Sequence, residues 1–161
     1  MKLKDNFSAK GEVHLKLICN KTGKIIDEMI NRNLIVKTGR VEVINMLAGD
    51  ATEPITKMQI GSGGADPGTP FIPIPPANSD MSLAESKGVS DISATIKDLD
   101  ATNPRVTFSA LFSSLTIDSV VNEVGLFFHS NTVMFARHTF KTVPLDADSD
   151  FSLQVNWAIE F

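Results

Sequence analysis

The last eleven residues of the chain constrain its fold more than any other feature. Apolar side chains alternate there with polar or small ones, and the apolar set is Phe151, Leu153, Val155, Trp157, Ile159 and Phe161. A period of two is that of a β-strand with one buried face. Such a strand belongs to a half-buried antiparallel sheet. We therefore expect an antiparallel β fold with these six residues in its core.

Further strand patterns occupy much of the chain. The predicted strands are residues 12–19, 24–36, 55–60, 93–99, 105–113, 121–128, 132–140 and 151–161. A turn at 20–23 and another at 129–131 close hairpins, and polar residues at 31–33 predict a bend or bulge. The core is expected to include Phe108, Phe112, Leu126 and Phe135 as well. About eight strands with short turns predict a mostly β domain, an antiparallel β-sandwich or flattened barrel.

One short helix is predicted over residues 38–48. Thr38 is a candidate N-cap, and Gly49 is placed to end the helix in a left-handed conformation. The apolar stripe of this helix consists of Val41, Ile44, Leu47 and Ala48. Because an isolated helix of roughly ten residues is marginal in water, we expect the stripe to pack on the sheet.

A long Gly- and Pro-rich loop is predicted at 61–79, projecting from a single domain 1–161 that begins with an extended segment 1–10. Its prolines remove backbone donors, so it can lie on a surface but cannot enter a central strand. The candidate partner contacts in it are Phe71, Ile72, Pro73, Ile74 and Pro75. Loops of this length are usually functional or disordered. Two interpretations stay open: an arm that becomes ordered on binding, or an intramolecular lid over one end of the sandwich.

Composition excludes several classes of function. The net charge of −4 lacks the basic excess that nucleic-acid binding requires, so no nucleic-acid partner is expected. No apolar run approaches the ~18 residues of a membrane span, and the polar start does not resemble a signal peptide. We expect a protein made and kept in a cytoplasm. Ten Phe, one Trp and no Tyr favour burial of aromatic rings over recognition of sugars or peptides.

No motif predicts an enzyme, a cofactor or a metal. The glycines at 61–64 lack the Lys-Ser/Thr of a phosphate loop and are interpreted as a flexible exit from a strand. The histidines His14, His129 and His138 have no metal-ligand spacing, and no Gly-x-Ser-x-Gly elbow is present. The acidic run 146–150 fails as an EF-hand, which leaves a looser calcium site or a solvated turn. Cys19 is expected to be an inert, half-buried thiol.

Glu123 and Arg137 lie across the predicted hairpin from each other. Two interpretations apply to them: an ion pair between subunits, or a cross-strand pair of modest value within one chain.

Several segments resemble small virion structural proteins of tailed bacteriophages. The segments that carry the resemblance, in order, are residues 33–40, 47–50 and 58–64, then Asn122-Glu123-Val124-Gly125-Leu126-Phe127-Phe128, Phe135-Ala136-Arg137 and Trp157-Ala158-Ile159-Glu160-Phe161. Together they cover about half of the chain.

This resemblance implies a non-enzymatic virion subunit, made in the cytoplasm of a bacterial host. It leaves open a capsid decoration (cement) subunit that bridges major capsid proteins, or a tail, collar, baseplate or fibre-attachment subunit. It also implies a homo-oligomer, with a trimer favoured. An alternative of another class is a receptor- or glycan-binding module.

Overall fold

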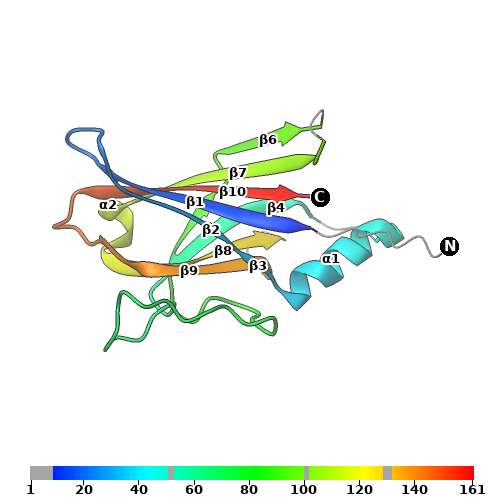
Figure 1. The fold of residues 1–161 in the computed structure, drawn as a ribbon, viewed down its shortest axis with the longest axis horizontal. Helices are drawn as coiled ribbons and strands as arrows, with labels where there is room; N and C mark the ends of the chain where they lie inside the picture. The colour runs from blue at the N-terminus through cyan, green and yellow to red at the C-terminus, as the bar shows by residue number, and fades with distance from the viewer. Residues whose placement is uncertain (1–8, 51–52, 100–101, 129–131) are drawn as a thin grey trace.

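The computed structural model describes residues 9–50, 53–99, 102–128 and 132–161, which form two packed sheets of five strands each (Figure 1). Sheet A contains β1 (Lys10–Cys19), β2 (Ile25–Arg32), β6 (Ala94–Asp98), β7 (Arg105–Ser113) and β10 (Phe151–Glu160). Sheet B contains β3 (Leu34–Ile35), β4 (Ile55–Gly61), β5 (Ser86–Asp91), β8 (Ser119–Phe128) and β9 (Val133–Leu145). All pairings are antiparallel. The prediction of a mostly β sandwich is confirmed, and the sheets do not close into a barrel.

The alternating C-terminal segment is the central strand of sheet A, whose order is β2-β1-β10-β7-β6. Trp157 of β10 lies between Val13 of β1 and Phe108 of β7, and all three side chains are buried. The other predicted core residues that are buried are Phe112, Leu126, Phe135, Leu153, Val155 and Ile159.

Two aromatic residues predicted for the core lie at its margin. Phe151 is only partly buried, although it packs against the core cluster. Phe161 is 42% exposed, which corrects its placement in the core. The reason is that β10 ends at Glu160, so the last side chain lies past the end of the layer that would cover it.

The polar residues at 31–33 mark the point where the chain changes sheets. β2 belongs to sheet A and β3 to sheet B, and Asn33 is the residue between them. The backbone N–H of Asn33 donates to the carbonyl of Gly11 in β1, 3.1 Å away. The predicted bend is therefore a corner of the sandwich, and it divides the predicted strand 24–36 in two.

Two elements carry no clear signal in the sequence. β5 (Ser86–Asp91) contains one large apolar residue, Val89, and forms an edge of sheet B by pairing with β4. The helix α2 (Ser114–Ile117) has a single turn, and the hydroxyl of Ser113 caps it by accepting from the N–H of Leu115 at 3.3 Å. The predicted turn at 129–131 lies outside the described residues.

Sheet B is covered on both faces, whereas the outer face of sheet A is largely polar. Residues on the inner face of β8, such as Val124 and Leu126, belong to the main core between the sheets. A second, smaller cluster consists of Val36, Leu83, Phe127 and Met134. Leu83 reaches this cluster from the long loop, which runs along the outside of β8 and β9 (Figure 1). Strands covered on both faces are buried almost continuously, which is the pattern of β8 and β9.

The helix α1 (Lys37–Ala48) is attached to sheet B mainly through its first turn, and Val43 in the second turn packs against the main core. Gly39 packs so closely on β9 that an added Cβ would lie 2.2 Å from the carbonyl oxygen of Phe135. The hydroxyl of Thr38 donates to the carbonyl of Met134 at 2.7 Å and does not cap the helix. The predicted stripe is exposed; its members are Val41, Ile44, Leu47 and Ala48. The expectation that the stripe packs on the sheet is therefore wrong, because the helix extends past the ends of the strands (Figure 1).

Candidate interaction surface

The long loop, residues 62–85, is closed at its base and held against the outer face of sheet B. Its first residue, Ser62, donates its backbone N–H to the carbonyl of its last, Glu85, at 2.9 Å. The loop therefore leaves β4 and enters β5 at nearly the same place. Beside this base lies Glu123 of β8, whose side chain is fully buried.

The carboxylate of Glu123 fastens both ends of the loop. Its Oε1 accepts the backbone N–H groups of Gly63 at 3.0 Å and Glu85 at 2.9 Å, and its Oε2 accepts that of Ala84 at 3.1 Å. A buried carboxylate is stable only where donors replace water. Three N–H groups of the loop provide such donors, so the loop must be in place for Glu123 to remain buried and charged.

Arg137 of β9 completes this network. Its Nη2 and Nε both donate to Oε2 of Glu123, at 2.6 and 3.1 Å, and its Nη1 donates to Asp80 of the loop at 2.6 Å. Burial opposes the charge of the guanidinium, but the hydrogen bonds with Asp80 and Glu123 outweigh burial and raise the pKa of Arg137 above its ordinary value. The pair is therefore a buried anchor between two strands of one chain, as the second interpretation expected, and the intersubunit interpretation is corrected.

A bulge in β8 directs a second side chain to the loop. The register of β8 against β9 shifts between Val121 and Glu123, so that Asn122 and Glu123 both face the loop. The Oδ1 of Asn122 accepts the N–H of Gly64 at 2.6 Å. A Cβ on Gly64 would lie 2.2 Å from the carbonyl oxygen of Asn122. The glycines interpreted as a flexible exit thus allow close contact between the loop and the bulge.

The middle of the loop is held by its backbone. Ile74 donates its N–H to the carbonyl of Gly64 at 2.8 Å and accepts the hydroxyl of Thr139 at the same distance. The carbonyl of Pro70 accepts the N–H of Thr142 in β9 at 2.9 Å. The loop therefore lies along a face of sheet B, neither as a free arm nor as a lid over one end, and the predicted projection at 61–79 is corrected accordingly (Figure 1).

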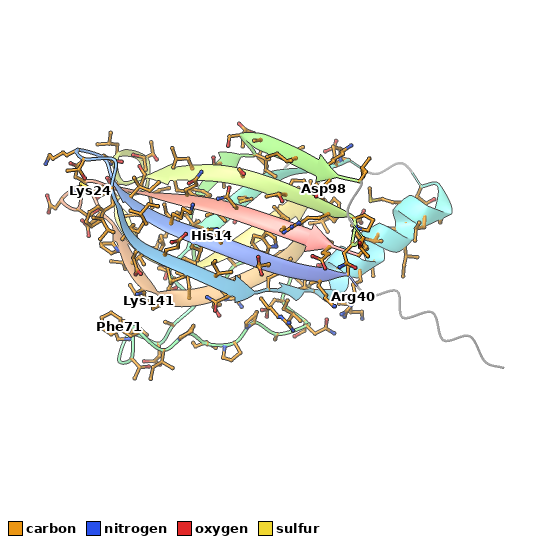
Figure 2. The ribbon with its side chains drawn as sticks, turned by 45° about the horizontal axis from the view of Figure 1, so that its top comes forward. His14, Lys24, Arg40, Phe71, Asp98 and Lys141 are labelled. Atoms are coloured by element: carbon orange, nitrogen blue, oxygen red, sulfur yellow. The ribbon has the colours of Figure 1, made fainter. Side chains whose placement is uncertain are left out.

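The side chains of this segment face solvent while its backbone is fixed. Phe71 is 74% exposed and Ile72 is 65% exposed, and Phe71 points away from the sheet in Figure 2. All five predicted contact residues are exposed: Phe71, Ile72, Pro73, Ile74 and Pro75. We call them the loop patch. Exposed apolar side chains on a rigid backbone are typical of protein-binding surfaces.

The candidates for chemistry do not converge. No group of three or more His, Cys, Asp or Glu in the described ranges is arranged to hold a metal ion, and this includes the acidic run 146–150. His14 bonds Glu28 on the outer face of sheet A, and His138 is buried on β9; His129 lies outside the described residues. Cys19 is half-buried beside Thr22, whose hydrogen bond lowers the pKa of the thiol.

None of the helices in the described part of the chain has the length and apolar character that crossing a bilayer requires. Comparison with protein-family models, with curated proteins and with solved structures found no match to this chain.

The sequence pointed to the loop patch but missed the anchor beneath it. Asp80 and Arg137 are 57 residues apart, and no local pattern links them. One usable signal was the pair Asn122-Glu123 inside an otherwise apolar strand, because two adjacent polar residues there are buried only at a bulge with partners.

Proposed function

We propose that this protein is a non-enzymatic assembly subunit that binds another protein through the loop patch. The observation that carries the proposal is the contrast between the buried anchor Glu123–Arg137 and the exposed Phe71 and Ile72 above it. A segment fixed before binding loses little conformational entropy when it binds, so its apolar side chains contribute more affinity. Phe71 is the aromatic anchor that such an interface requires.

We further propose that the assembly is the virion of a tailed bacteriophage. The support is the ordered resemblance of short segments to small virion proteins, of which Glu123 to Phe128 and Phe135 to Arg137 also form the sheet that carries the loop. The favoured role is a capsid decoration (cement) subunit, homo-oligomeric, made in the host cytoplasm and bridging major capsid proteins. The only Trp, Trp157, is buried between the sheets, and the exposed ring of Phe71 has no polar group. Both observations argue against the receptor- or glycan-binding alternative, because Phe lacks the polar handle that Trp and Tyr offer a ligand.

A tail, collar, baseplate or fibre-attachment subunit would use the same surface with a different partner. Particle reconstruction by cryo-EM separates the two roles. Density on the outer surface of the head supports decoration. Density confined to the tail or collar excludes decoration and supports the second role.

The binding step has a direct test with matched variants. Purified protein is added to particles that lack this subunit, and binding is measured by co-sedimentation for wild type, Phe71→Ser and Ile96→Ser. Both residues are exposed and apolar, but Ile96 lies on the edge strand β6 of sheet A. We expect Phe71→Ser to weaken binding at least tenfold and Ile96→Ser to leave it within twofold. Equal affinity of wild type and Phe71→Ser would contradict the proposed role of the loop patch.

A further inference from the structure

The helix α1 exposes apolar side chains that none of the described residues of its own chain covers. Ile44 is 63% exposed and Leu47 is 80% exposed, and both lie beyond the first turn of the helix. The helix is nevertheless well terminated, because Gly49 has a φ of 85° and its N–H donates to Met46, while Asp50 donates to Asn45. A defined helix with uncovered apolar residues is typical of a surface that is buried in an assembly.

An apolar groove of about 1010 Å³ lies beside this helix, at the open end of the sandwich. Both sheets and the helix contribute to its walls, and its apolar lining includes Leu47, Phe108, Phe128, Phe135, Ile159 and Phe161. Lys97 is the one charged side chain among the described residues that line it. Phe161, the residue that the core does not cover, contributes to this surface. The groove is therefore suited to an apolar occupant.

We propose that the occupant is a second copy of this chain, in a two-fold dimer in which each copy places the exposed side of α1 in the groove of the other. This interface is separate from the loop patch and does not depend on it. Figure 2 shows α1, with Arg40 labelled, at the same end of the sandwich as Asp98, the last residue of β6. The loop patch, with Phe71 labelled, lies toward the opposite end.

Self-complementarity argues for a second copy. A two-fold interface places one patch of the surface against the same patch of the partner, so that patch must present both a projection and a recess. The helix is the projection and the groove is the recess, and they are contiguous because Val43, Met46 and Leu47 line the groove from the helix.

The size and the low polarity of the surface formed by the groove and the helix agree with a dimer interface. Ten of the fourteen residues that line the groove are exposed or partly exposed, and the exposed helix residues outside it include Arg40, Val41, Ile44 and Ala48. These residues would form the centre of an interface, which in a stable complex has ~20 or more residues a side. An interface centre depleted in charge is the ordinary composition of a homodimer.

The mass of the protein in solution is the first test. We expect light scattering after size exclusion to give about 35 kDa, twice the 17.5 kDa of one chain, and Leu47→Asp to give a monomer with an unchanged circular dichroism spectrum. Because Leu47 is exposed, the substitution does not disturb the single chain. Phe71→Asp is the matched control and should remain dimeric. A monomeric wild type, a trimer of about 52 kDa, or a dimer insensitive to Leu47→Asp would each overturn the proposal.

Disulfide trapping tests whether α1 of one copy lies in the groove of the other. Single variants Leu47→Cys and Thr95→Cys are prepared in a Cys19→Ser background, and the two are mixed under oxidising conditions. Thr95 lies on β6 at the groove, so a helix that enters the groove of the other copy brings the two thiols together. We expect a mixed disulfide dimer that is at least tenfold more abundant than in a mixture of Leu47→Cys with Phe71→Cys. Equal yields in the two mixtures would contradict the exchange and assign the groove to another occupant, such as residues 1–8 of the same chain or a small apolar molecule.

Discussion

The outer face of sheet B and the end of the sandwich at α1 expose apolar residues in different ways. At sheet B the chain covers its own strands with the loop 62–85, and it fastens that loop through the buried charges of Glu123 and Arg137. At α1 the attachment uses backbone contacts at Gly39, one hydroxyl bond from Thr38 and the packing of Val43 on the core. The apolar side chains left exposed on the helix are Val41, Ile44, Met46, Leu47 and Ala48. The outer face of sheet B is covered by a loop that polar groups of the chain hold in place, whereas the apolar side of α1 is exposed.

The difference indicates how each region is used. A fully satisfied buried network of charges rigidifies the segments that it joins. The loop is therefore held in one conformation, which suits the proposed binding of another protein. Among the described residues the helix end has no such network, and we propose that association covers its apolar surface. Four predictions, from the largest expected effect to the smallest, test this contrast.

Replacing the anchor should have the largest effect. Glu123→Ala removes the acceptor of three backbone N–H groups and leaves Arg137 buried with Asp80 as its only carboxylate partner. Removing one member of a buried ion pair typically costs about 3 to 5 kcal/mol of unfolding free energy. Urea denaturation measures this loss, and limited proteolysis should show faster cleavage within residues 62–85.

The control for this variant is an exposed ion pair. Asp91 pairs with Lys57 at the surface and is 81% exposed, so Asp91→Ala should cost less than about 1 kcal/mol. If Glu123→Ala were as stable as Asp91→Ala, the loop would not depend on the buried network.

His138 tests how a buried ionisable group without a charged partner affects the free energy of unfolding. It is adjacent to Arg137 on β9, its Nε2 has no partner among the described residues, and burial lowers its pKa from 6.5 to about 4. The pKa of His138 is lower in the folded chain than in the unfolded chain, so protonation favours the unfolded chain. Burial of neutral His138 therefore costs no stability above pH 6.5, and the free energy of unfolding decreases as the pH falls toward 4. A difference of about 2.5 pH units at ~1.4 kcal/mol each predicts a loss of about 3 kcal/mol.

The measurement compares wild type with His138→Leu, since carboxylates also titrate in this range. The free energy of unfolding is determined at pH 7 and pH 4 for both proteins. The loss between these values should be about 3 kcal/mol larger for wild type. Parallel pH profiles would show that His138 is protonated in the folded state without penalty.

Replacing one leucine in the loop and one in the helix by alanine compares how much each segment contributes to stability. Leu83 of the loop is 6% exposed and packs with Phe127 and Met134, so Leu83→Ala should cost about 2 to 3 kcal/mol. Thermal unfolding should shift downward by roughly 2 to 4 °C for each kcal/mol lost. A change of less than 0.5 kcal/mol would mean that the loop does not pack on sheet B in solution.

Leu47→Ala should have the smallest effect on the folding of the single chain. Leu47 is exposed, and surface substitutions of this kind usually change stability by less than about 0.5 kcal/mol. Stability is measured at low protein concentration, where dimers dissociate, and again at high concentration. We expect the variant to match wild type at the low concentration and to be less stable at the high one. A loss above 1 kcal/mol at the low concentration would place Leu47 in the core of its own chain.

The sequence predicted β8 and β9 as well, but it determined most clearly the strands with one buried face. Alternation in residues 151–160 and 105–113 predicted β10 and β7, because a period of two places every second side chain on the same face. The corner at Asn33 was also predictable, since three adjacent polar residues interrupt a strand. β5 was not predictable, because an edge strand with little apolar content is formed by pairing with its neighbour β4.

Only the tertiary structure decided what covers each surface. The sequence alone predicts an amphipathic helix at α1 and an apolar loop at 71–75, but not whether their side chains are buried. Burial depends on what lies opposite, and the anchor at Glu123 joins residues from 63 to 137 that are close only after folding. For the same reason alternation placed Phe161 on the inner face but could not show that its side chain is 42% exposed. Alternation depends on neighbouring residues and determines which face of a strand a side chain lies on. Burial depends on residues that are distant in the sequence, so it is determined only when the chain folds.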